Sequence, residues 1–376
     1  MSDEQTPTQD GSGGTEYVVR PFRSQDSTDV LSLYRTVWGA DRDQRWFDWK
    51  YDANPYLDGP PMIVASTGQE VVGARPFYPF PIATGSTEMT GIYCGDLMVH
   101  PDHRRQGLFT RMTDRAMQSD ISGAFMFNFG NELSTPGFKK LGWQPVGTGP
   151  RRVFRIQWPS PQLQPRLGER LGLVAGALTT PVVRTYLRSR SLVRRSVDHS
   201  LTREQQLGIP AEQLEALYDC NRPQQLHTRR EPRLYRWLSA NPVWQYETYL
   251  ASRDGTPRAA LVVRSRSDTE SSMLQVVDAL PPVTSSRESA FTALLQTLVE
   301  DRRDRSAIEI KGPVIHERLF QRGLLSTFGF HSTSSPPLSL VAAKNNTMFV
   351  CPHDRTESTV DGVDLTDPDD WLVRAH

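Results

Sequence analysis

Two arginines and one glycine occupy the turn between a predicted buried strand and a predicted helix, where a protein can bind phosphate. These residues are Arg104, Arg105 and Gly107. The first N–H groups of a helix have no partner inside the helix and carry partial positive charge, so they attract anions. Glycine has no Cβ and lets the backbone approach a ligand closely. Because the arginines add full positive charge, the turn suits a pyrophosphate.

The elements that position this turn are predicted by the spacing of apolar residues. Residues 92–99 are apolar except for Asp96, which predicts one strand buried over most of its length. Leu108, Met112 and Ala116 recur at i, i+4 and i+8, which predicts a helix with one apolar face. The turn contains neither GxxxxGK[ST] nor GxGxxG, so it is neither a P-loop nor a dinucleotide-binding fingerprint.

A second strand and turn follow in the chain. Residues 124–129 carry phenylalanines at alternate positions, which predicts a strand with an aromatic face. The next segment, residues 131–143, reads NELSTPGFKKLGW.

These two segments resemble the motifs of the GCN5-related N-acetyltransferase (GNAT) superfamily. Motif A of that family runs V-x-P-x-x-[RQ]-x-x-G-x-[GA], and this chain matches it in register at Val99, Pro101, Arg104 and Gly107. Phe109 departs from the motif, because it stands where the family has glycine or alanine.

The second segment resembles the family pattern N-x-x-S/A, a helix, and then Y-x-K-L-G-F. Asn131 and Ser134 match its first part and residues 140–143 match its end, while Phe138 stands where the family often has tyrosine. The resemblance covers residues 15–155. It implies an α+β fold in three layers, with a mixed, mostly antiparallel sheet flanked by helices.

The resemblance also implies acetyl-CoA as co-substrate. In the family a backbone N–H of the central strand binds the oxyanion of the thioester, which maps to Met98 or Val99 here. The full set of cofactor-binding residues that the resemblance implies is Met98, Val99, Arg104, Arg105, Gln106, Gly107, Leu108, Phe109, Asn131 and Phe138.

Acyl transfer to an amine requires a base for the amine proton, a donor for the oxyanion and a proton for the leaving thiolate. Asp96 is the first candidate base, because partial burial raises the pKa of a carboxylic acid; a structural aspartate paired with an arginine is the alternative. Glu132 is the second candidate, and its alternative is a carboxylate at a helix start. Phe138 cannot donate a proton, so the sequence does not identify the residue that protonates the leaving thiolate.

An internal repeat indicates a duplicated domain. The motif at residues 45–49 recurs at 233–237 with an offset of 188, and Asn54-Pro55 recurs as Asn241-Pro242 with an offset of 187. Two further landmarks recur at offsets of 186 and 187, residues 63–66 at 249–252 and residues 141–143 at 328–330.

The second copy lacks the phosphate chemistry of the first. Aligning Phe109 with Phe291 puts Ser289 opposite Gly107, and the preceding segment contains one arginine, Arg287. We therefore predict that the second copy is degenerate and binds no coenzyme. Its role stays open between a structural one and that of a wall of the acceptor site.

The chain is thus predicted to contain five segments. They are a disordered tail (1–14), an acyl-CoA-binding domain (15–155), a basic helical linker (156–205), a degenerate acetyltransferase-like domain (206–345) and a C-terminal tail (346–376). The linker interleaves arginines with apolar residues. Packing against a domain and peripheral contact with an anionic lipid surface or a lipid-linked substrate are its two interpretations.

Composition excludes several classes of protein. The formal net charge is zero, so no strong field attracts the chain to nucleic acid. The three cysteines are widely spaced and form no CxxC, which indicates neither a disulfide framework nor a metal site. No apolar run reaches the length of about 18 residues that a spanning helix requires. We expect a cytoplasmic protein; its oligomeric state stays open.

The sequence therefore favours an acetyl-CoA-dependent N-acyltransferase with tandem domains, which acts on the amine of a small molecule or sugar. One alternative is a non-catalytic tandem module that binds acyl-CoA or acts as a scaffold. A FemX-like aminoacyl transferase is the other, although the motif A match in the first copy argues against it.

Overall fold

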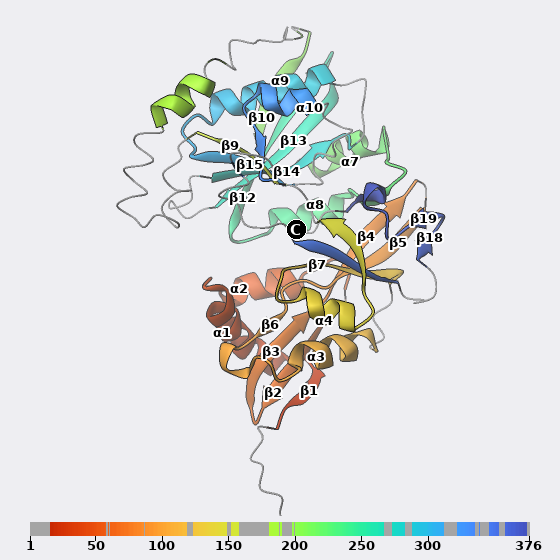
Figure 1. The fold of residues 1–376 in the computed structure, drawn as a ribbon. Helices are drawn as coiled ribbons and strands as arrows, with labels where there is room; N and C mark the ends of the chain where they lie inside the picture. The colour runs from red at the N-terminus through yellow and green to blue at the C-terminus, as the bar shows by residue number, and fades with distance from the viewer. Residues whose placement is uncertain are drawn as a thin grey trace, which may run out of the picture. The chain divides into compact units, whose positions relative to one another are not determined.

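The computed structural model in Figure 1 describes most of the chain. The described residues are 16–57, 59, 61–85, 87–118, 123–148, 152–157, 180–187, 189, 198, 200–266, 273–282, 288–311, 322–334, 338, 346–352 and 358–373. Internal contacts divide the chain into two units. Unit 1 comprises Met1–Gln44, Pro60–Pro76 and Asp96–Ile121, and unit 2 comprises Arg45–Gly59, Phe77–Gly95 and Ser122–His376.

Unit 1 contains a four-stranded antiparallel sheet in the order β1-β2-β3-β6. Its strands are β1 (Val18–Pro21), β2 (Met62–Thr67), β3 (Glu70–Pro76) and β6 (Met98–Val99). Nearly all residues of β2 and β3 are buried, because helices pack against the sheet.

Two helices pack against the sheet of unit 1. The first, α1 (Ser27–Trp38), contacts β3 and β6 and buries Val30 and Leu33. The second, α3 (Leu108–Met117), contacts β1, β2 and β3. Its buried face contains Leu108, Met112 and Ala116, which confirms the apolar spacing in the sequence.

The single strand expected over residues 92–99 is interrupted, so that prediction is wrong in its middle. Strand β5 ends at Tyr93 and β6 starts at Met98, and Asp96 between them has a left-handed backbone with a φ of 51°. Both flanks of the break remain buried, including Ile92 and Met98. Because hydrophobic patterns report burial, they do not reveal a local bend in a buried segment.

The first sheet of unit 2 has seven strands in the order β20-β11-β4-β5-β7-β17-β8. The strands are β4 (Tyr78–Thr84), β5 (Thr87–Tyr93), β7 (Phe125–Gly130), β8 (Gln144–Thr148), β11 (Leu226–Thr228), β17 (Thr347–Pro352) and β20 (Trp371–Leu372). The pair β5–β7 is parallel, and β4–β5 and β7–β17 are antiparallel. Helix α4 (Thr135–Lys140) connects β7 to β8.

The second sheet of unit 2 also has seven strands, in the order β10-β12-β13-β14-β15-β9-β16. The strands are β9 (Arg152–Ile156), β10 (Thr202–Leu207), β12 (Trp244–Arg253), β13 (Thr256–Arg266), β14 (Met273–Leu280), β15 (Ala307–Lys311) and β16 (His331–Ser332). The pair β14–β15 is parallel, as β5–β7 is in the first sheet.

Helices cover both faces of this second sheet. Figure 1 shows α9 (Glu288–Asp301) and α10 (Arg322–Thr327) on one side and α8 (Pro232–Ser239) on the other. Helix α7 (Ala211–Asp219) packs with α8 in a common hydrophobic core. Both units therefore combine sheets of mixed or antiparallel type with flanking helices, and the predicted α+β class is confirmed.

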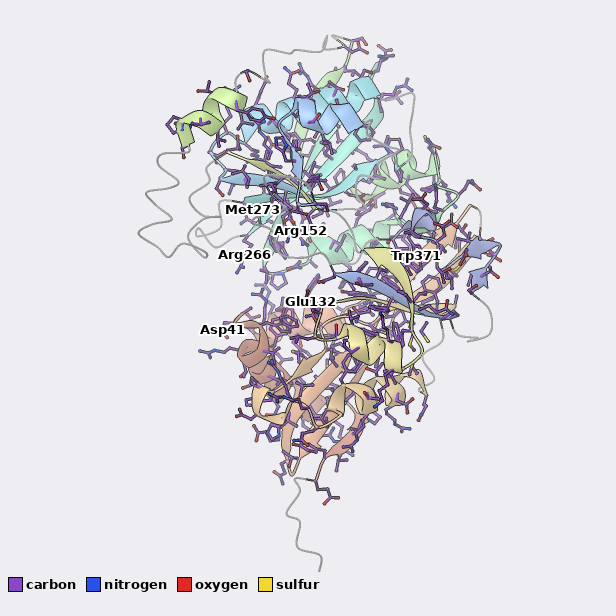
Figure 2. All side chains as sticks on the ribbon, viewed as in Figure 1. Asp41, Glu132, Arg152, Arg266, Met273 and Trp371 are labelled. Atoms are coloured by element: carbon purple, nitrogen blue, oxygen red, sulfur yellow. The ribbon has the colours of Figure 1, made fainter. Side chains whose placement is uncertain are left out.

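One strand from each half of the chain lies in the sheet of the other half. Strand β9 from the first half lies between β15 and β16, and β17 near the end of the chain lies between β7 and β8. On β9, Arg152 (labelled in Figure 2) donates from Nε to Oε1 of the buried Glu309 at 2.5 Å. The sequence did not predict this exchange, since it assigned residues 346–376 to a tail.

Equivalent tryptophans of the two copies contact each other within unit 2. Nε1 of Trp49 donates to the carbonyl of Trp237 at 2.7 Å, and Nε1 of Trp237 donates to the carbonyl of Trp49 at 2.8 Å. The two rings stack with centroids 5.1 Å apart. A two-fold axis brings equivalent residues of two copies into contact with each other. The reciprocal contact of Trp49 and Trp237 is of this kind.

Most of the predicted linker, residues 156–205, lies outside the described residues. Residues 180–187 are helical. Among the described residues, no helix combines the length and the apolar character needed to cross a bilayer.

Candidate functional site

The predicted phosphate turn lies in unit 1 between β6 and α3, and it is exposed. Residues 104–107 are all exposed, and Gly107 is the N-cap of α3 with a φ of 71°. No side chain caps this end of the helix. A Cβ added at Gly107 would meet no atom within 4 Å. The start of α3 is thus exposed and uncapped beside a glycine that leaves room for a ligand.

One residue of the same turn has a strained backbone. Arg105 has a φ of 64°, which is rare for a residue with a Cβ, and it lies two positions before the left-handed Gly107. Such conformations cost of order 1–3 kcal/mol and cluster at ligand-binding sites. The turn is therefore held in a shape that its own residues do not favour.

Tyr17 supports the turn from β1's side. Its hydroxyl lies 3.0 Å from Nδ1 of His103, and its carbonyl accepts a hydrogen bond from Arg111 on α3 at 2.7 Å. His100 caps the short 3-10 helix in the turn, because its Nδ1 accepts from the N–H of Asp102 at 3.4 Å. Tyr17 was not among the residues expected from the sequence, and nothing in its local pattern marks it.

The edge of β6 presents backbone groups away from β3. The N–H of His100 donates to Val72 on β3 at 2.9 Å, so the neighbouring residue Val99 directs its N–H and C=O to the opposite edge. Nε of Arg104 donates to the carbonyl of Val99 at 3.3 Å on that outer edge. Met98, two residues before His100, faces β3. Val99 is therefore the residue of this pair whose N–H faces away from the sheet.

Asp96 lies in the interruption between β5 and β6, and not within a strand as predicted. Asp96 is partly exposed. Because its backbone is left-handed, the in-and-out alternation of a strand does not set the direction of its side chain. Burial and the Asp96 carboxylate raise the pKa of Tyr34 on α1. The guanidinium of Arg42 also acts on Tyr34 and opposes this rise in pKa. Asp96 thus shares its surroundings in unit 1 with a phenol and a guanidinium that the sequence pattern did not mark.

The second predicted segment lies in unit 2. Oδ1 of Asn131 accepts from the N–H groups of Leu133 and Ser134 at 3.1 and 3.0 Å, so Asn131 shapes the start of α4. Glu132 (labelled in Figure 2) follows β7 and is exposed.

Phe138 is fully buried in unit 2. Its ring lies 4.9 Å from that of Trp143 and 5.3 Å, stacked, from that of Phe349 on the exchanged strand β17. A tyrosine hydroxyl at this position would enter an aromatic core. The contacts explain why the chain has phenylalanine where the motif often has tyrosine.

The structure gathers the predicted residues into two groups. Unit 1 contains Asp96, Met98, Val99 and residues 104–109, and unit 2 contains Asn131, Glu132 and Phe138. The segment that would form the corresponding turn of the second copy, residues 283–287, lies outside the described residues.

Comparison with known proteins finds a family model that matches the first copy. A family model described as "Acetyltransferase (GNAT) domain" matches residues 18–146, which include the exposed turn and Asn131 to Trp143. Residues 18–146 are therefore similar in sequence to a GNAT domain. No curated protein matched the sequence.

Solved structures extend the likeness to the whole chain. A tandem GNAT protein from the clavulanic acid biosynthesis pathway (without AcCoA) superposes with a TM-score of 0.54 at 12% identity, over 90% of this chain and 99% of that one. A GCN5-related N-acetyltransferase from Anabaena variabilis ATCC 29413 superposes with a TM-score of 0.57 at 12% identity, over 90% and 73%. One from Kribbella flavida gives 0.51 at 15% identity, over 89% and 70%.

The chain therefore has the tandem GNAT fold that the sequence resemblance implied. At these identities the structural likeness concerns the fold. The family match supports acyl transfer as the general chemistry of the GNAT domain.

Proposed function

We propose that this protein is an acetyl-CoA-dependent N-acyltransferase that acylates the amine of a small molecule or sugar. The supporting observation is the start of α3, which is exposed, has no side-chain cap and follows the left-handed Gly107. This end of the helix lies within the part of the chain that matches the GNAT family. Arg104 and Arg105 flank it with two guanidinium groups, which suit the diphosphate of a coenzyme.

Acetyl-CoA fits the residues at this turn. The N–H groups of residues 106–109 and the two arginines would bind the pyrophosphate, and Gly107 leaves space for its approach. The outward N–H of Val99 is our preferred donor to the thioester oxygen, because the N–H of Met98 faces β3. Asn131 and Phe138 stay predicted cofactor contacts.

The chemical step requires that the amine lose a proton. In our proposal Asp96 accepts this proton, the nitrogen forms a bond to the acyl carbon, the carbon–sulfur bond breaks, and the thiolate takes up a proton. Glu132 is the alternative base. Tyr34 is the proposed proton donor to the thiolate, because it is a phenol that shares the surroundings of Asp96.

The double variant Arg104→Ala, Gly107→Glu tests coenzyme binding. It removes one guanidinium and places a carboxylate at the helix start, so we expect the affinity for acetyl-CoA in calorimetry to fall by at least about 100-fold. Gly255→Glu is the matched control, because Gly255 also has a positive φ (75°) and an added Cβ there would likewise meet no atom within 4 Å. Equal affinity of the double variant and the control would refute the proposal.

One observation favours a second function, a module that binds acyl-CoA without catalysis. Phe138 stands where the motif often has tyrosine, so this position offers no hydroxyl. Its ring is buried in the aromatic core. Saturable binding of acetyl-CoA without turnover across a panel of amines would select this function over the first.

A further inference from the structure

The ammonium group of Lys50 in unit 2 lies over three aromatic rings. Its Nζ is 4.9 Å from the ring centroid of Trp46, 5.8 Å from that of Tyr51 and 5.3 Å from that of Tyr78. We call these three residues the aromatic box. They are buried, with exposures of 6%, 1% and 4%, whereas Lys50 is partly exposed. A cation over the face of an aromatic ring is attracted by the ring quadrupole.

The rings of the aromatic box support one another. Trp46 meets Tyr51 edge-on with centroids 6.1 Å apart, and Tyr51 stacks on Tyr78 at 5.8 Å. Because the rings are buried and mutually packed, they keep their faces directed to the same place whether or not a cation is present.

The first copy has one extra residue in the segment that contains Lys50. Trp49 and Asn54 are five positions apart, whereas their equivalents Trp237 and Asn241 are four apart. The extra residue coincides with a π-helical turn over Asp48–Asp52, where the second copy continues as the α-helix α8. Single π-helical turns arise from such insertions and frequently lie at functional sites.

The second copy has no aromatic box. With the offset of 188, Leu238 stands opposite Lys50 and Leu234 opposite Trp46. Both leucines are buried in the core between α7, α8 and the sheet. The fold therefore does not need a lysine and aromatic rings at these positions.

Two carboxylates on the same π-helical turn favour a cation there. Asp48 and Asp52 are exposed and flank Lys50 in the chain. Burial raises the pKa of Asp52, and the Asp48 carboxylate raises it further. A positive charge near this turn relieves the repulsion between the two carboxylates.

We propose that the aromatic box is a binding site for the alkylammonium group of a ligand, and that Lys50 occupies it until the ligand displaces the lysine. An alkylammonium is also the form in which an amine acceptor reaches the enzyme in water, so the inference rests on and sharpens the proposed function. Its test measures binding and requires neither acetyl-CoA nor turnover.

The test uses tetramethylammonium, with tert-butanol as a neutral molecule of similar size. In Lys50→Ala we expect tetramethylammonium to quench tryptophan fluorescence with an affinity at least about 5-fold higher than that of tert-butanol, since only the cation gains from the rings. The wild-type protein should bind it about 10-fold more weakly, because Lys50 competes. Lys139→Ala, an exposed lysine outside the aromatic box, should behave as wild type. Equal affinity for the cation and the alcohol in Lys50→Ala would overturn the proposal.

A second measurement on the unmodified protein covers the case in which Lys50→Ala fails to fold. An amine-reactive reagent labels exposed lysines, and peptide mass spectrometry gives the labelling rate of Lys50 relative to Lys139. We expect tetramethylammonium to raise this ratio several-fold by displacing Lys50 from the aromatic box. An unchanged ratio at saturating tetramethylammonium contradicts the displacement. Loss of acetyl-CoA affinity in the turn variant would be a separate result, because neither experiment contains coenzyme.

Discussion

Asp96 in the first copy and Asp278 in the second are equivalent, since the alignment that pairs Phe109 with Phe291 also pairs these two residues. Asp278 is 2% exposed and accepts hydrogen bonds from Tyr235 at 2.9 Å and from the N–H of Ala279 at 3.0 Å. Asp96 is partly exposed on a left-handed bend. The aspartate is therefore a feature of the repeat, while its exposure and its backbone conformation differ between the copies.

An arginine that both copies share shows the same difference in exposure. Arg230 is 4% exposed and lies 3.5 Å from Asp278, while its equivalent Arg42 is partly exposed. The hydroxyl of Tyr218 lies 2.7 Å from Nε2 of the buried His227, at the position where the first copy has Gly39. The second copy thus buries the aspartate and the arginine that both copies share, and it adds a tyrosine–histidine contact for which the first copy lacks the histidine.

Divergence between the two copies therefore need not remove the polar residues that they share. A buried polar group that is fully hydrogen-bonded stabilises a unique core, whereas the same group near solvent can exchange protons with a substrate. Other equivalent positions differ in residue type, such as Gly39 and His227.

The largest effect that we expect is on catalysis in the first copy. Asp96→Asn should lower kcat by about 10²- to 10⁴-fold, because the amine would lose its base. Steady-state rates with acetyl-CoA and an accepted amine measure this, and circular dichroism checks folding. If Glu132→Gln lowers kcat instead and Asp96→Asn does not, Glu132 is the base and Asp96 is structural in both copies.

Removal of the equivalent aspartate should affect stability. Asp278→Ala leaves the guanidinium of Arg230 buried without its carboxylate, so we expect the free energy of unfolding in urea to fall by about 3–5 kcal/mol. Asp96→Ala should cost about 1 kcal/mol or less, since Asp96 is partly exposed. Equal losses of stability in Asp278→Ala and Asp96→Ala would show that the two aspartates contribute equally to folding.

Acid should weaken the second copy through His227. Burial lowers the pKa of His227 to about 4 from 6.5, and Arg230 adds to this. The unfolded chain then binds the proton more readily than the folded chain, so the stability contribution is complete above pH 6.5 and is lost as the pH falls towards 4. The shift corresponds to about 3 kcal/mol.

His227→Leu provides the comparison for this pH dependence. Urea unfolding of wild type and variant between neutral pH and pH about 4 should give curves that differ in slope, with the flatter one for the variant. Parallel curves would mean that His227 takes up its proton equally well in the folded and unfolded chain.

The smallest effect concerns the contact between the copies. Trp49→Phe and Trp237→Phe each remove one of two reciprocal hydrogen bonds, so each should lower the free energy of unfolding by about 0.5–1.5 kcal/mol, and by similar amounts. The double variant should differ from the sum of the two, because the stacked rings are in contact. Unequal single effects would argue against a two-fold relation of the two tryptophans.

Local patterns predicted much of the candidate site. The turn with Arg104 and Gly107 and the apolar face of α3 were predicted correctly, because capping geometry and helical periodicity depend on residues close in sequence. The duplication was also visible, since both copies kept the motif around Trp49 and Trp237.

Other features could not be predicted from local patterns. The exchange of β9 and β17 pairs residues far apart in the chain, and a hydrophobic pattern does not say which sheet a strand joins. The support of the turn by Tyr17 depends on the pairing of β1 with β2, and the break at Asp96 lies inside a segment that is buried on both sides.

By itself the sequence determined which residues are present in both copies and which turn we propose as the diphosphate site. Those properties follow from residue type and spacing. Tertiary structure decided which aspartate is closed off and which is near solvent, and which strand completes which sheet. The physical reason is that burial and strand pairing are set by residues distant in the chain, whose contacts no local pattern contains.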